Sequence, residues 1–301
     1  NHGAVVDHDV QLGAFCHVAP NATLGGSVRV GQRVLVGASA VVLPGIVIAD
    51  DVVVGDLPAA SLHESAPLYH RPLAPPADLD ARRADSANAL DAGDLAADLL
   101  AMLCDTTWVS SQYDHQLFLN TVEEPGGDAA VLRLKHPLTG FDTGRGLAFT
   151  TDGNHRWCAV DPRVGATATV VESVMNLATV GARPIAVVNC LNFGNPEHPE
   201  VMWQLSEAID GMSEACRAFD LPVIGGNVSL YNESRGSDID PTPVVATLGI
   251  VDSLDRRPPG VGLVEGGRLL LLGSTERELS GSLWARNRGH RRGTLPADDL
   301  D

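Results

Sequence analysis

The chain has 301 residues, enough for about two domains of ordinary size, and a formal net charge of -17. Most of its length lacks a cluster of Lys or Arg, so we expect neither a nucleic-acid partner nor an anionic membrane partner. No apolar run approaches the ~20 residues of a membrane helix, and the five cysteines lack C-x-x-C spacing, so we expect a cytoplasmic protein with reduced thiols. Because it begins with Asn1 rather than Met, we expect a fragment of a longer protein.

Residues 1–55 repeat with a period of six. An aliphatic residue stands at every sixth position from Val6 to Val54, and a small or apolar residue lies two positions before each. Neither a helix nor a single strand has this period. It is typical of a parallel β-helix, in which each hexapeptide forms one flat side of a triangular coil. The segment therefore predicts a β-helix of about three coils.

Residues 56–93 lose this repeat and are rich in Pro, Ala and charged residues, which is typical of a linker or a covering arm. From residue 94 the pattern alternates between helix and strand without a strict βαβ repeat. We therefore expect an α+β domain over 94–263, with Asp94 as the N-cap of its first helix, and the truncated start of a following domain over 264–301.

Two amphipathic helices are predicted in the α+β domain. In the helix over 165–180, Glu172 and Asn176 share one face, whereas the apolar face carries Val170, Val174, Leu177 and Val180. In the helix over 199–219, the residues expected to point inward are Met202, Leu205, Ile209, Met212 and Phe219.

Three polar segments come directly after, or at the end of, apolar strands. They read TDGN (151–154), NCLNFGNP (189–196) and GGNVS (225–229), and we expect them to be loops that lie together at one side of a sheet. Glycines let the backbone approach an anion, and Asn227 and Ser229 offer oxygen atoms to a hard cation or a hydroxyl group. The last segment suits a magnesium nucleotide; an ordinary turn is the alternative.

The segments CLNFGNPEHPEVMW, GGNVSLYNES and ASLHESAPLYHRP resemble the second half of the small form of the formylglycinamidine ribonucleotide synthetases, over about residues 57–301. The resemblance implies the fold of the aminoimidazole ribonucleotide synthetase superfamily. It also implies ATP, Mg²⁺ and the conversion of formylglycinamide ribonucleotide to its amidine, with ammonia from a separate glutaminase subunit.

The same resemblance implies a role for four residues. Asn189 and Gly226 would contact ATP, Asn227 would bind magnesium, and Ser229 would contact the substrate. Many members have Asp where Asn189 stands, so this position keeps an oxygen but lacks the charge. The family's catalytic His lies in the first half, so no catalytic residue is expected in this part, and we expect little or no turnover by the chain alone.

The segment VVDHDVQLGAFCHVAP resembles the left-handed β-helix of acetyl-CoA-dependent sugar O- and N-acetyltransferases of the sialic-acid and bacillosamine type. That resemblance implies the left hand, His8 as a general base tuned by Asp9, and His17 near the thioester carbonyl. The two histidines are nine residues apart, so we expect them on different faces of the coil. Three functions stay open: a ligase of purine biosynthesis, an acetyltransferase, and an inactive chimera. The partners expected are a homodimer through the α+β sheet or a trimer through the β-helix.

Overall fold

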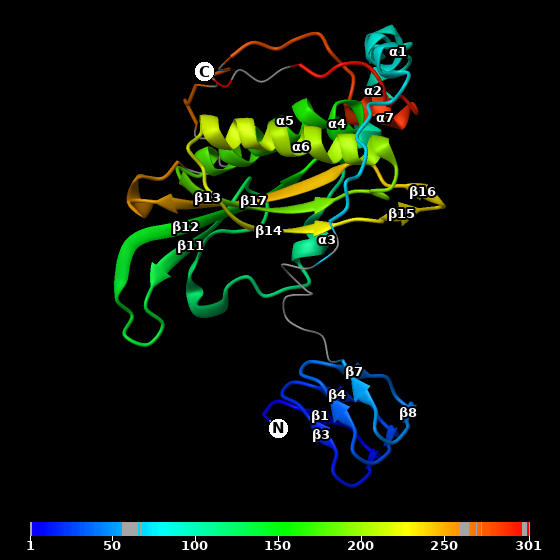
Figure 1. The fold of residues 1–301 in the computed structure, drawn as a ribbon. Coiled ribbons are helices and arrows are strands. Elements are labelled where there is room, and N and C mark those ends of the chain that lie inside the picture. Colours follow the sequence, from blue (N-terminus) through cyan, green and yellow to red (C-terminus); the bar gives the residue numbers. More distant parts are fainter. Residues whose placement is uncertain are drawn as a thin grey trace. The chain divides into compact units, whose positions relative to one another are not determined.

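The computed structural model describes residues 2–55, 66, 68–258, 265–268, 270–271, 273–296 and 300 (Figure 1). Contacts between residues divide the chain into a first unit, residues 1–70, and a second unit, residues 71–301. Within these described ranges, no helix combines the length and the apolar character that a membrane crossing requires.

The first unit stacks short parallel strands into three sheets. The sheets have the strand orders β1-β4-β7, β2-β5-β8 and β3-β6-β9, and each strand pairs with the strand one full coil further along, as in Val6↔Leu24 and Leu24↔Val42. This arrangement is consistent with the predicted parallel β-helix. The strands are β1 (Val5–Val6), β2 (Gln11–Leu12), β3 (His17–Val18), β4 (Thr23–Leu24), β5 (Arg29–Val30), β6 (Leu35–Val36), β7 (Val41–Val42), β8 (Val47–Ile48) and β9 (Val53–Val54).

The six-residue repeat sets both the core and the corners of this unit. The repeat positions from Leu24 to Ile48 are buried, whereas Val6 and Leu12, in the first coil, are about half exposed. Between strands the chain turns through residues with φ near +60°, a conformation that Gly, Asn and Asp tolerate best. These corner residues are Gly3, Asp9, Phe15, Asn21, Ser27, Arg33, Ser39, Gly45 and Asp51. The six-residue period of the sequence therefore corresponds to one corner of the coil per hexapeptide.

The second unit is built on a six-stranded sheet with the order β10-β11-β12-β17-β13-β14. Its pairs are antiparallel except for β13 and β14, which run parallel. The edge position of β14 leaves one side of that strand without a partner in the described sheet. The strands are β10 (Thr121–Glu123), β11 (Ala130–Lys135), β12 (Asp142–Gly153), β13 (Arg183–Asn192), β14 (Val223–Ser229) and β17 (Thr242–Val251), with a separate hairpin of β15 (Glu233–Ser234) and β16 (Ser237–Asp238).

Three helices cover one face of this sheet: α4 (His155–Val160), α5 (Pro162–Thr179) and α6 (Pro199–Ala218) (Figure 1). Asp161 caps α5, because its Oδ1 accepts hydrogen bonds from the backbone N–H groups of Arg163 and Val164. The predicted inner face of α5 is confirmed, since its apolar residues are buried or pack against the buried core. On α6 the prediction for Ile209 is wrong, because 41% of Ile209 is exposed and its neighbour Ala208 takes the buried position.

The remaining described elements flank the sheet. They are α1 (Leu79–Ala84), η2 (Ala87–Ala89), α2 (Leu95–Met102), α3 (Thr107–Ser110), η3 (Leu117–Leu119), η4 (Leu254–Arg256) and α7 (Leu283–Asn287). The Asp94 carboxylate accepts a hydrogen bond from the Ala97 N–H and caps α2, as predicted. We call residues 71–102 the arm and residues 273–296 the C-terminal segment. They pack together around a small core of Ala87, Trp284 and Ala285.

Candidate functional site

The polar segments expected as loops are largely strand ends. Thr151 to Gly153 close β12, Asn189 to Asn192 close β13, and residues 225–229 belong to β14. The prediction of loops here was wrong, because each segment extends its strand and stays paired with the neighbouring strand. Their convergence is real, however: Asp152 and Asn189 both pair with Val245, and Asn189 pairs with Gly226. These four residues form one row across the sheet.

Asn189 and Gly226 lie in close contact in this row. A Cβ atom added to Gly226 would overlap the Asn189 Oδ1 and would lie 2.8 Å from the Asn189 backbone oxygen. Only glycine fits here. Asn189 lies between the buried Val187 and Leu191, two positions from each along β13, so its amide shares their face, which the helices cover.

Asn227 points the other way. It pairs with Cys190, the neighbour of Asn189, so both side chains project from the face opposite the helices. The Asn227 Nδ2 lies 3.8 Å from the Cys190 Sγ. Ser229 lies two residues further, where its Oγ is 3.3 Å from the Asn232 Oδ1. The structure therefore brings the four predicted residues to one corner of the sheet but divides their side chains between its two faces.

A polar cluster that was not assigned from the sequence lies at the other end of the same row. The Asn176 Nδ2 donates a 2.8 Å hydrogen bond to the Asp152 Oδ1, and the Asp152 Oδ2 is buried without a partner among the described residues. Burial, followed by the nearby Asp152 carboxylate, raises the pKa of Glu172. The shared helical face of Glu172 and Asn176 was the available signal, but only the fold shows that it meets Asp152.

These oxygen atoms suit a hard divalent cation better than Asn227 does alone. Magnesium prefers carboxylate and amide oxygens and water, and an unpaired buried carboxylate oxygen is the kind of ligand it takes. Asn227 instead has the sulfur atom of Cys190 as a neighbour, which magnesium does not favour. Within the described ranges, no group of three or more His, Cys, Asp or Glu residues could hold a metal ion. A cation here would therefore be bound by two carboxylates, an amide and water.

The residues assigned to an acetyltransferase lie in the first unit. The His8 Nδ1 is 3.0 Å from the Asp9 Oδ2, and Gly26 lies beneath the imidazole ring, where a Cβ atom would be 2.7 Å from Cε1. His8 follows β1, whereas His17 belongs to β3, a strand of a different sheet. The predicted His8–Asp9 pair therefore forms, and the two histidines belong to different sides of the coil.

Comparison with known proteins gives a clear pattern. Residues 126–251 match the family model of AIR synthase related protein, N-terminal domain. The chain is 49% identical to the phosphoribosylformylglycinamidine synthase subunit PurL of Parafrankia sp. (strain EAN1pec) over 259 residues, covering 83% of this chain and 33% of that protein. The corresponding subunit of Renibacterium salmoninarum is 43% identical over 254 residues, covering 81% and 32%. The chain thus spans about a third of the length of these relatives.

Solved structures are also similar in part. PurLQS from Thermotoga maritima is 36% identical with a TM-score of 0.46, covering 51% of this chain and 25% of that chain. The structure described as T. maritima PurL complexed with ATP is 36% identical with a TM-score of 0.43, covering 49% and 23%.

Proposed function

We propose that this chain, whose residues 126–251 carry an AIR synthase-related N-terminal domain, supplies part of a phosphoribosylformylglycinamidine synthase. The reaction is the ATP-dependent conversion of formylglycinamide ribonucleotide to formylglycinamidine ribonucleotide in purine biosynthesis, with ammonia from a separate glutaminase subunit. The supporting observation is an identity of 42% to 49% with PurL subunits over most of the chain. Because the chain spans about a third of these relatives, we expect it to form one wall of the site.

ATP would bind at the corner formed by β13 and β14. Gly226 has no side chain and so leaves room for the Asn189 amide. Its strand, β14, is the edge strand of the sheet. A ligand at this edge can therefore reach the Asn189 amide on one face and Asn227 on the other. Ser229, two residues along the same strand, would contact the ribonucleotide substrate.

Magnesium, when bound, would neutralise the charge of the transferred phosphoryl group. Asn227 is the ligand that the family resemblance implies, whereas the oxygen atoms that fit a hard cation best are those of Asp152, Glu172 and Asn176. These residues would hold the ion through the Asp152 and Glu172 carboxylates and the Asn176 amide. Burial and the nearby Asp152 carboxylate raise the pKa of Glu172, so a bound cation would favour its ionised form.

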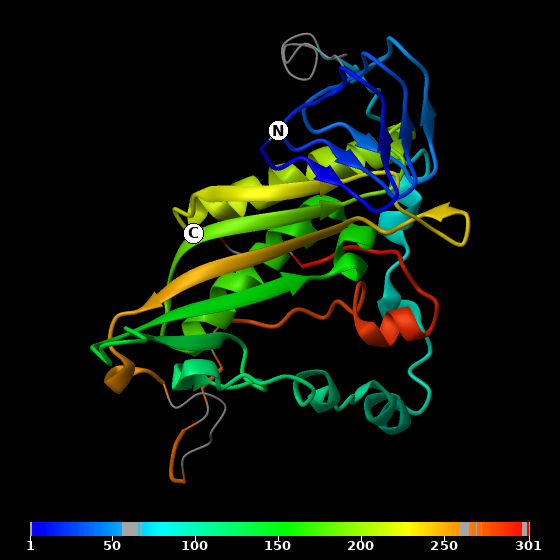
Figure 2. The same cartoon turned by 90° about the horizontal axis from the view of Figure 1, so that it is seen from below.

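The face of the sheet opposite the helices would bind a second copy of the chain or a domain of the same kind. Figure 2 shows the sheet from the side opposite the helices. Large apolar side chains are exposed on β11, β12 and β13, with 41% of Leu132, 42% of Phe149 and 38% of Val188 accessible. An apolar sheet face of this kind is typical of an interface.

The first unit supports a second candidate function. The His8–Asp9 pair on a stack of parallel strands suits an acetyl-CoA-dependent acetyltransferase with a left-handed β-helix that works as a trimer, in which His8 takes a proton from the acceptor and His17 lies near the thioester. Acetyl-CoA turnover that His8→Ala abolishes would support it. If the chain binds neither ATP nor acetyl-CoA, it is the inactive chimera that the sequence left open.

Calorimetric titration with ATP and magnesium tests the first proposal. We expect saturable binding at millimolar ATP or below, and a loss of at least tenfold in affinity for Asn227→Ala, with Asn287→Ala in α7 as the matched control. A sizing measurement in the same buffer shows whether the chain forms a dimer. The absence of nucleotide binding at millimolar ATP would refute the proposed site, and robust amidine synthesis by the chain alone would contradict the partial role.

A further inference from the structure

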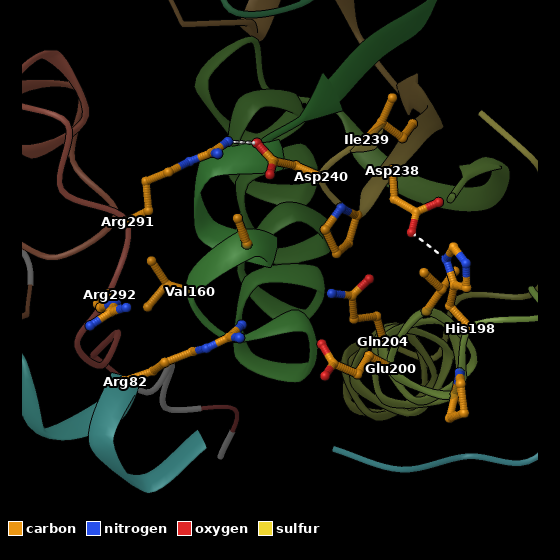
Figure 3. A pocket seen from close by; sticks show the side chains of 14 residues that line it. Arg82, Val160, His198, Glu200, Gln204, Asp238, Ile239, Asp240, Arg291 and Arg292 are labelled. Carbon is orange, nitrogen blue, oxygen red and sulfur yellow. Dashed lines mark hydrogen bonds and ion pairs between the residues drawn. The ribbon is translucent and has the colours of Figure 1, made fainter. Parts of the chain in front are cut away.

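A pocket of about 610 Å³ lies in the second unit, and its lining contains no residue of β13 or β14 (Figure 3). The arm contributes Arg82, the C-terminal segment contributes Arg291 and Arg292, and the start of α6 contributes Glu200 and Gln204. The end of α4 and the chain from Asp238 to Pro241 also line it. Its volume is within the usual range for small-molecule sites, about 300–1,000 Å³.

One wall of the pocket carries guanidinium groups. Figure 3 shows Arg82 reaching from the arm toward the start of α6. Its Nε is 2.7 Å from the Asp78 carboxylate, so this contact leaves the terminal nitrogens directed into the pocket. Arg292 lies 3.5 Å from Asp85. Both partner carboxylates lie outside the pocket lining, and both pairs are partly exposed, which makes them weak.

The opposite wall carries acceptor groups. Glu200 is in the first turn of α6, and Gln204 follows one turn later on the same face. In the described part of the chain, no cation forms an ion pair with Glu200. Further along this wall the His198 Nδ1 lies 2.7 Å from the Asp238 carboxylate. Arg291 is already paired with Asp240 within the lining, so the cationic side opposite Glu200 is formed by Arg82 and Arg292.

The balance of charge decides which ligand fits. Three guanidinium groups and three carboxylates line the pocket: Arg82, Arg291 and Arg292, and Glu200, Asp238 and Asp240. A phosphate dianion would therefore find no net positive field here. A ligand that carries both charges and no net charge matches each wall with its opposite.

We propose that this pocket binds a free α-amino acid, a function separate from the proposed nucleotide site. The carboxylate would lie against the terminal nitrogens of Arg82, in the two-bond geometry that guanidinium and carboxylate groups favour. The ammonium group would lie against Glu200, and the side chain would extend toward Gln204 and His198. The arm and the C-terminal segment must both be docked for the pocket to form.

The test is calorimetric titration of the full chain with glutamine, glutamate, arginine and leucine separately, up to about 10 mM, which covers millimolar dissociation constants. We expect saturable binding of at least one of them. Arg82→Ala and Glu200→Gln should each weaken it by about tenfold or more, since each removes one charged partner. Arg217→Ala and Glu207→Gln, on the same helix α6, are the matched controls. Thermal unfolding confirms that each variant folds.

Blocked ligands sharpen the test. The N-acetyl derivative of the amino acid that binds removes the ammonium group, and the amide derivative removes the carboxylate, so both should bind at least tenfold more weakly. The proposal is overturned if none of the four amino acids binds, or if inorganic phosphate binds in their place. It is equally overturned if folded Arg82→Ala and Glu200→Gln bind as the wild type does, or if the blocked derivatives bind equally well.

Discussion

Two adjacent glycines in β14 should respond oppositely to the same added methyl group. In Gly226→Ala the new Cβ would overlap the Asn189 Oδ1 and would lie 2.8 Å from the Asn189 backbone oxygen, which belongs to the paired strand and cannot rotate away. In Gly225→Ala the nearest atom would be the Val188 Cγ1 at 3.9 Å, an ordinary van der Waals contact. The second change is therefore a matched control for the first.

The expected difference follows from these contacts. Replacing a strand glycine by alanine adds roughly 0.5–1 kcal/mol of stability by restricting the unfolded chain. That gain is common to both variants and cancels between them. Overpacking costs typically about 1–3 kcal/mol, so Gly226→Ala should have a free energy of unfolding lower than that of Gly225→Ala by about that amount. Gly225→Ala should equal or exceed the wild type.

Urea unfolding followed by tryptophan fluorescence measures this difference. All four tryptophans lie in the second unit, so the signal reports the unit that contains β14. Titration of the same proteins with MgATP then separates stability from binding, because only Gly226→Ala should also weaken nucleotide binding. Equal unfolding midpoints for the two variants would refute the contact between Gly226 and Asn189, and with it the proposed shape of the nucleotide corner.

Three further changes test other parts of the second unit. Burial raises the pKa of Glu172 above its ordinary 4.5, so ionising this carboxyl group lowers the stability of the folded protein as pH rises through the raised value. Glu172→Gln should therefore be more stable than the wild type above pH 4.5 and should lose that advantage in acid. Unfolding measurements at several pH values test this. Gly211→Ala places a Cβ against the backbone carbonyl of Arg163 where α5 and α6 cross. Overpacking of up to about 3 kcal/mol, less about 1 kcal/mol gained by alanine in a helix, should lower the unfolding free energy by about 2 kcal/mol; unchanged stability would contradict that close packing. Burial raises the pKa of the Cys158 thiol to about 12, so a thiol reagent should modify the exposed Cys104 in the native protein and reach Cys158 only after unfolding, as mass spectrometry of the labelled peptides would show.

The strands of the first unit could be predicted because its sequence repeats at a fixed period. Each hexapeptide repeats one strand and one corner, so the period alone identifies the strands, and the buried repeat positions such as Leu24 and Val36 follow. The long helices of the second unit were also accessible, since their faces follow the helical period. Ile209 shows the limit: a face deduced from apolar residues alone can shift by one position when a small residue such as Ala208 packs closer.

The corner formed by β13 and β14 could be located from the sequence, but the faces to which its side chains point could not be predicted. Its glycines and asparagines indicated a turn, yet they extend an edge strand, where polar side chains can face solvent. The face that each residue occupies depends on strand register. Between Val187 and Val188 the register with β14 shifts, because Val187 pairs with Val223 whereas Val188 pairs with Gly225. This bulge leaves Ile224 unpaired and reverses the faces of the residues that follow it.

The amino-acid pocket depends on contacts that no local pattern contains. The Ala87 N–H donates to the Ser280 hydroxyl, and the Gly293 N–H donates to the backbone oxygen of Arg82, so the arm and the C-terminal segment meet across nearly two hundred residues of sequence. The second bond attaches Arg82 directly to the segment that carries Arg292. Because one wall of the pocket comes from both pieces, a change that separates them should abolish amino-acid binding while leaving β13, β14 and the nucleotide corner intact. Ser280→Ala leaves the buried Ala87 N–H without its partner and should therefore weaken amino-acid binding more than nucleotide binding.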